Sequence, residues 1–61
     1  MKVRDLKKLL RQQGWYHVRT RGSHHHYEHP DSPILITVPG HDRDEVKPGI
    51  LIKVLKQAGL R

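Results

Sequence analysis

The sequence predicts a small α+β domain of two layers, in which two helices pack on one face of a three-stranded antiparallel sheet. Apolar residues recur at helical spacing near both ends of the 61-residue chain, and three short runs rich in β-branched and aromatic residues lie between them. Glycine and proline turns separate those runs. A chain of this length is expected to form a single domain, residues 1–61, whose sheet leaves one face open to solvent or a ligand.

The first element is expected to be a helix over residues 3–13. Its buried side would consist of four apolar residues at helical spacing: Val3, Leu6, Leu9 and Leu10. Gly14 stands where a glycine in the left-handed conformation commonly ends a helix. We therefore expect the chain to turn there and enter the sheet.

Two strands joined by a tight turn should follow. Residues 15–21 and 24–29 contain aromatic and β-branched members, and the pair Gly22-Ser23 between them suits a type II′ hairpin turn. Two prolines follow the second run and end it, because prolines so close together cannot both lie inside a paired strand.

The second half of the chain predicts a strand, a loop and a helix. Residues 34–38 are the strongest strand candidate and should form the central or best-buried strand. Residues 39–48 read as a loop about ten residues long, a length that often has a function. The last helix has an apolar stripe that consists of Ile50, Leu51, Val54, Leu55 and Ala58, and Gly59 is expected to end it.

Composition indicates a polyanionic partner. Twelve lysines and arginines against six acidic residues give a formal net charge of +6, which favours nucleic acid first and an acidic protein next, or else a basic but merely solvated surface. The chain has no cysteine and hence no disulfide, and no apolar run approaches the roughly 20 residues of a membrane span. We expect a soluble, cytoplasmic protein with no membrane contact.

Strand alternation divides the histidines between the two faces of the sheet. A two-residue turn would place one set of side chains together on the open face: His17, Arg19, Arg21, His24, His26 and Glu28. The other set is more apolar and is expected to contact the helices: Tyr16, Val18, Thr20, His25, Tyr27 and His29. A slip of one residue in the pairing would exchange the two sets.

His24 and two arginines form the candidate site. Histidine is the side chain whose charge changes nearest to neutral pH, and nearby arginines disfavour its protonated form, so His24 is expected to be a neutral base. Arg19 and Arg21 are expected to hold a phosphate by paired hydrogen bonds, with His26 beside them. The competing interpretation is that these histidines are ordinary polar strand residues.

A metal site is the other possible use of the histidines. His24 and His26 share a face, but a catalytic zinc usually needs a third protein ligand. Only His17, Glu28 or His41 could supply it. We therefore expect no metal in this protein.

Several further residues have both a functional and a structural interpretation. Trp15 would stack on an unpaired base or, as we prefer, anchor the junction between the first helix and the first strand, and Tyr27 is expected in the core. Lys47, near the start of the last helix, is a candidate phosphate contact, whereas His41 is expected to be an exposed loop residue. Basic residues on the helix faces either follow phosphates or are ordinary solvated charges: Lys7, Lys8, Arg11, Lys53 and Lys56. Three loop acids would repel RNA and keep it on the strand side: Asp42, Asp44 and Glu45.

Six short motifs occur in a fixed order along the chain: Gly14-Trp15, Arg19, Gly22-Ser23-His24-His25, His29-Pro30, residues 36–39 and Lys47-Pro48-Gly49. In this order and spacing they resemble the HicA toxins of bacterial and archaeal HicAB toxin–antitoxin systems, nearly from end to end. The resemblance implies a fold like the double-stranded-RNA-binding domain and ribosome-independent cleavage of mRNA. It also implies that His24, the histidine after Gly-Ser, is catalytic. A cognate HicB-like antitoxin would cover the active surface, and no metal cofactor is expected.

The candidate site suggests how such a nuclease would work. His24 would take the proton from a ribose 2′-hydroxyl, which then attacks the adjacent phosphate, while Arg19 or Arg21 stabilises the charge that builds on the phosphorus centre. Two other functions are compatible with the same residues. One is a non-catalytic RNA-binding module with the same fold, and the other is a small protein whose basic face binds only an acidic partner.

Overall fold

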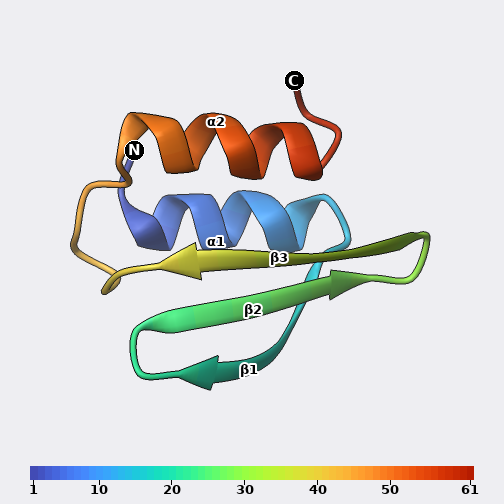
Figure 1. Ribbon diagram of the computed structural model, residues 1–61, viewed down its shortest axis with the longest axis horizontal. Coiled ribbons are helices and arrows are strands. Elements are labelled where there is room, and N and C mark those ends of the chain that lie inside the picture. Colours follow the sequence, from blue (N-terminus) through green and yellow to red (C-terminus); the bar gives the residue numbers. More distant parts are fainter.

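The computed structural model describes residues 1–61 and has the element order that the sequence predicts (Figure 1). The elements are α1 (Val3–Gln12), β1 (Tyr16–Arg21), β2 (His24–His29), β3 (Ser32–Pro39) and α2 (Pro48–Gln57). The strands form one antiparallel sheet in the order β1-β2-β3, and both helices lie on the same side of it (Figure 1). The predicted two-layer α+β fold is therefore confirmed. Neither helix is long and apolar enough to cross a membrane.

The core lies between the helices and the two strands nearest to them. All nine buried residues are hydrophobic and form one cluster: Val3, Leu6, Leu10, Trp15, Tyr27, Ile36, Val38, Val46 and Val54. The three residues from α1 are spaced three and four apart, so they lie on one face of that helix. No residue of β1 is buried, and this outer strand is thus held mainly by its pairing with β2.

β3 meets one of the two alternatives that the sequence left open for it. Residues 34–38 were expected to form the central or best-buried strand, but the sheet order places β2 in the centre and β3 at an edge. β3 is nevertheless the strand that buries most, through Ile36 and Val38. An edge position also explains why Pro33 and Pro39 lie inside β3, because an edge strand leaves alternate N–H groups unpaired.

The end of α1 is closed by the glycine that the sequence singled out. Gly14 has a φ of +91°, its N–H donates to the Arg11 carbonyl at 3.1 Å, and the Trp15 N–H donates to the Leu10 carbonyl at 3.0 Å. These are the bonds of a Schellman motif. They direct Trp15 into the core, where only 4% of it is exposed, so Trp15 anchors the helix–strand junction and is not free to stack on a base.

The loop between β3 and α2 folds back on the start of α1. The Val3 N–H donates to the Asp44 carbonyl at 2.9 Å, and the Arg4 N–H donates to the Asp42 carbonyl at 3.1 Å. Because α1 has no side-chain N-cap, these loop carbonyls satisfy helix N–H groups that would otherwise lack partners. The Lys7 ammonium reinforces the contact by donating to the Asp42 carboxylate at 2.7 Å.

Candidate functional site

The β1–β2 turn determines where the candidate site begins. Gly22 has a φ of +60°, and no residue other than glycine has a positive φ. A glycine with positive φ followed by Ser23 with negative φ is the pattern of a type II′ turn, as predicted. Arg21 consequently pairs with His24 directly across the turn.

The turn places the predicted site residues together on the open face. Arg21 pairs with His24 and Arg19 with His26, as expected. Tyr27, the residue after His26 in β2, is 1% exposed beneath the helices, so His26 and its neighbours in register point to the opposite face of the sheet. We use the term open face for the sheet surface away from the helices, which carries Tyr16, Arg19, Arg21, His24, His26 and Glu28. The structure therefore assembles two arginines and two histidines in a patch two strands wide.

His24 is the accessible histidine of this patch. It is exposed, and it lies between Arg21 on β1 and Pro39 on β3. Its ring makes no hydrogen bond, in contrast to His26, whose ring is bonded to a neighbouring strand. Both ring nitrogens of His24 are thus available to a ligand.

His26 is held in place, and its protonated form is disfavoured. It is half-buried, and its Nδ1 lies 3.0 Å from the Thr37 hydroxyl on β3. Partial burial lowers the pKa of His26 below its ordinary value of 6.5, and the charges of Arg19, His24, Arg21 and His17 lower it further. The arginine charges of the open face therefore act on His26.

His25 belongs to a hydrogen-bonded chain on the helix side of the sheet. Its Nε2–H donates to the Gly40 carbonyl at 2.8 Å, and its Nδ1 lies 3.1 Å from the Thr20 hydroxyl. That hydroxyl lies 2.7 Å from Nε2 of His17. The chain links β1, β2 and the residue after β3, so these two histidines support the hairpin.

His29 also has a structural role. Its Nδ1 accepts the Asp31 N–H at 3.0 Å, and its Nε2–H donates to the Gln13 carbonyl at 3.1 Å. The ring also packs against Trp15 with a centroid separation of 5.1 Å. His29 therefore connects the end of β2 to the end of α1, on the helix side as predicted.

A bulge at Val18 overturns two of the predicted side-chain positions. His17 was expected on the open face opposite Glu28, but it pairs with Tyr27, and its ring lies 5.6 Å from the Tyr27 ring. Tyr16 was expected on the helix side but pairs with Glu28 and is 48% exposed. The cause is one extra residue in β1, which shifts the pairing between His17 and Arg19.

One signal in the sequence could have revealed this bulge. In an unbroken strand, Trp15 and Arg19 lie on the same face, because side chains alternate with a period of two. Trp15 was expected in the core and Arg19 on the open face, and both expectations hold only if the strand contains an extra residue. Tyr16 is accordingly a residue of the open face that simple alternation does not identify.

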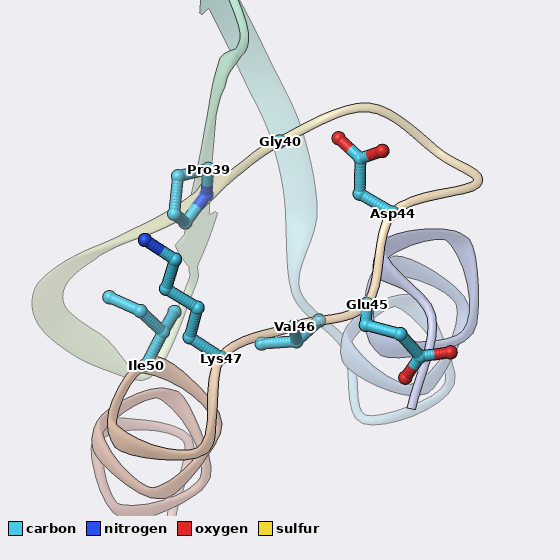
Figure 2. A pocket seen from close by; sticks show the side chains of 7 residues that line it. All are labelled: Pro39, Gly40, Asp44, Glu45, Val46, Lys47 and Ile50. Atoms are coloured by element: carbon cyan, nitrogen blue, oxygen red, sulfur yellow. The ribbon is translucent and has the colours of Figure 1, made fainter.

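Lys47 lies beyond the His24 end of the sheet. It precedes α2 and lines a pocket of about 250 Å³ together with Pro39, Gly40, Asp44, Glu45, Val46 and Ile50. Figure 2 shows its side chain extending past Ile50 toward Pro39. Because Pro39 pairs with His24, this exposed lysine is close to the candidate site in the fold although it is distant in sequence.

Two of the three acidic residues of the loop, Asp42 and Glu45, contact cations of the N-terminal segment. The Lys7 hydrogen bond and charge lower the pKa of Asp42, and Glu45 bonds the N-terminal ammonium at 3.1 Å, which lowers the pKa of Glu45. Lys7 is therefore engaged in an ion pair, which leaves it less available to phosphate than the sequence suggests. His41 is exposed in this loop, as expected. No three His, Asp or Glu side chains come together as metal ligands.

The family to which the chain belongs follows from its similarity to known protein families. Its sequence matches the family described as HicA toxin of bacterial toxin-antitoxin over residues 3–60, which is nearly the whole of its 61 residues. The chain belongs to the HicA toxin family. No curated protein matches it.

Membership of the HicA toxin family makes the protein a toxin of a toxin–antitoxin system, and it implies an antitoxin as partner. The match begins with the first residue of α1 and ends just beyond α2. It therefore includes the whole open face, together with Lys47.

Proposed function

We propose that this HicA toxin is an endoribonuclease that cleaves mRNA without a metal, with His24 as general acid and base. The observation that carries the proposal is the position of His24: an exposed histidine with an unoccupied ring, paired across the strands with an arginine. A basic patch provides attraction for phosphate, and a free imidazole provides proton transfer. Both requirements of RNA cleavage are met by side chains of the same face.

The reaction would use the ribose of the substrate as nucleophile. His24 accepts the proton of the 2′-hydroxyl, and the 2′-oxygen forms a bond to the adjacent phosphorus. The bond from phosphorus to the 5′-oxygen then breaks, and the protonated His24 returns its proton to that oxygen. The products are a 2′,3′-cyclic phosphate and a 5′-hydroxyl, and proton transfer of this kind contributes roughly 10²- to 10⁴-fold in rate.

The other residues of the patch would bind the phosphate backbone. Arg21, directly across from His24, is placed to stabilise the charge on the reacting phosphate, and Arg19 and His26 lie one row further along the sheet. Lys47 would contact the RNA beyond the Pro39 end of β3. The substrate path would therefore follow the hairpin and pass the Pro39 end of β3 to reach Lys47.

The antitoxin would act by covering this same surface. We propose a HicB-like protein as the partner, in keeping with the family to which the toxin belongs. Because the open face carries unpaired arginines, an antitoxin surface that covers it would require acidic residues to compensate their charge. Neutralisation would then consist of excluding RNA from His24.

The decisive experiment compares His24→Ala with His41→Ala. Both variants remove an exposed histidine, but His41 lies in the loop between β3 and α2, outside the strands that form the open face. Purified wild type and His41→Ala are expected to cleave an mRNA transcript and leave 2′,3′-cyclic phosphate or 3′-phosphate ends, whereas His24→Ala should lose cleavage. Circular dichroism would check that both variants are folded.

The same measurements separate a nuclease from a non-catalytic RNA-binding module. A binding module would bind RNA in a salt-sensitive manner and leave it intact in every variant. Equal RNA decay with and without His24 would reject the catalytic assignment. Products with 3′-hydroxyl ends would reject the 2′-hydroxyl mechanism.

A further inference from the structure

Tyr16 occupies an unexpected position on the open face. The bulge at Val18 turns it away from the helices, while its neighbours Trp15 and His17 point the other way, one into the core and one against Tyr27. Tyr16 is consequently 48% exposed. An aromatic side chain so placed contributes little to the core.

The surroundings of Tyr16 favour a base over a phosphate. Its partner across the strands is Glu28, an exposed carboxylate that forms no ion pair or side-chain hydrogen bond. A negative charge repels phosphate, but it accepts hydrogen bonds from amino groups. On the edge strand β3, Leu35 alternates with the buried Ile36 and is 38% exposed, which adds apolar surface to the open face.

Tyr16 and the candidate catalytic residue lie at opposite ends of one basic face. Arg21, the residue across from His24, lies five positions after Tyr16 in β1. At about 3.3 Å per residue this distance is roughly 16 Å or somewhat less because of the bulge. Arg19 lies between the two ends, so an RNA strand held at its phosphates by the arginines would extend to Tyr16.

We propose that Tyr16 and Glu28 form a subsite for one unpaired base of the RNA, with Tyr16 stacking on the base and Glu28 accepting a hydrogen bond from its amino group. The subsite rests on the RNA-binding part of the function proposed above. Adenine, cytosine and guanine carry an exocyclic amino group and uracil carries none. The subsite therefore favours bases whose amino group reaches Glu28 over uracil, whose only donor is its ring N3–H, a few nucleotides from the cleaved bond.

Binding of short 2′-O-methyl oligonucleotides tests the stacking. This modification blocks the nucleophile, so full-length protein can be titrated into fluorescent oligoadenylate, oligocytidylate or oligouridylate without cleavage. Tyr16→Ala should weaken binding of oligoadenylate about 5- to 150-fold, the loss expected from one base–aromatic stack, and Tyr16→Phe should retain the affinity. Ile52→Ala is the matched control, because Ile52 is an exposed apolar residue on α2 and should not change binding.

Substitution of Glu28 tests the selectivity. Glu28→Gln adds a donor that uracil can accept, so the preference for oligoadenylate and oligocytidylate over oligouridylate should fall. Asp5→Asn removes an exposed carboxylate on α1 and should leave the preference unchanged. Thermal unfolding of every variant would show that the fold is intact.

Three outcomes would overturn the subsite. Equal affinity of Tyr16→Ala and wild type would exclude stacking and leave the antitoxin as the ligand of this end of the face. An unchanged base preference in Glu28→Gln would exclude the selective hydrogen bond. If the wild-type protein bound none of the oligonucleotides, RNA binding at this face would be excluded. The cleavage test with His24→Ala does not depend on these binding measurements.

Discussion

His26 is the residue whose charge state the fold controls most directly. Its ring is bonded to Thr37 on one side and faces Arg19 on the other, and no acidic group compensates a positive charge there. Glu28 shares the same face two residues along the strand, and Arg21, His24 and His17 supply the other charges nearby. The folded state thus disfavours the protonated form of His26.

This property predicts how stability depends on pH. The unfolded chain takes up a proton on His26 near the ordinary pKa of 6.5, whereas the folded protein takes it up only at lower pH, because the pKa is lowered. Between these two values the unfolded state holds more protons, so the free energy of unfolding rises with pH and falls as the solution is acidified below about 6.5. His26→Gln should flatten this dependence.

Urea unfolding at about pH 7.5 and about pH 5.5 would measure the effect. His41→Gln is the control, because His41 is exposed in the loop and makes no side-chain hydrogen bond. If His26→Gln lost as much stability on acidification as wild type, the pH dependence would belong to other histidines.

At the scale of elements, the bulge in β1 is the feature that shapes the open face. A bulge adds a residue to one strand while the partner strand continues in register. Arg19 pairs with His26 and His17 pairs with Tyr27, so the ladder already runs as though Val18 were absent. Val18 makes none of the strand pairs that determine on which face Tyr16 and the arginines lie.

Deletion of Val18 should accordingly preserve the fold and the site. The shortened strand would pair regularly, with every remaining side chain on the face that it occupies now, and RNA cleavage should persist. Deletion of Thr20, a regularly paired residue, would instead move the side chains before it to the opposite face and should abolish folding or activity. Circular dichroism and RNA cleavage would distinguish the two deletions.

The glycines that end α1 and form the hairpin turn differ in how much they resist substitution. Both have positive φ, which costs an alanine roughly 1–2 kcal/mol. At Gly14, a Cβ atom would also lie 2.8 Å from Nε2 of His29, whereas at Gly22 no atom lies within 4 Å. Gly14→Ala should therefore destabilise the protein more than Gly22→Ala.

Thermal unfolding of the two variants would measure this difference, with Gly49→Ala as a control, since Gly49 lies in the first turn of α2 with open space beside it. Equal losses at Gly14 and Gly22 would mean that His29 moves aside freely and does not hold the end of α1 against β2.

At the scale of the whole molecule, charge is distributed unevenly between the two layers. The loop acids Asp42 and Glu45 are paired with cations of the N-terminal segment, while Arg19 and Arg21 on the open face form no ion pair. The two guanidinium groups of the open face are therefore available to phosphate, although ten of the twelve lysines and arginines lie outside that face.

This distribution predicts which residues carry the salt dependence of RNA binding. For single-stranded RNA, each phosphate contact contributes about 0.7 to the slope of log affinity against log salt concentration. Arg19→Gln and Arg21→Gln should each lower the slope by about that amount, and Lys53→Gln on α2 should not change it. A lowered slope in Lys53→Gln would place part of the RNA path on the helices.

The sequence by itself determined the features that depend on neighbouring residues. Helical spacing and Gly14 located the first helix to within one residue, and the two-residue turn at Gly22 paired Arg21 with His24. Both are local, because a cap or a tight turn imposes its geometry on the few residues beside it. The pairing of His24 with an arginine, on which the proposed function rests, therefore needed no tertiary information.

Only the tertiary structure decided the features that depend on the helix layer. Trp15 must reach the core while Arg19 stays outside, and the bulge at Val18 satisfies both demands. The bulge turns Tyr16 outward and His17 inward, a change that alternation along one strand cannot predict. Burial of an aromatic side chain contributes more free energy than one regular strand pair, so packing against the helices overrides the local pattern at the far end of β1.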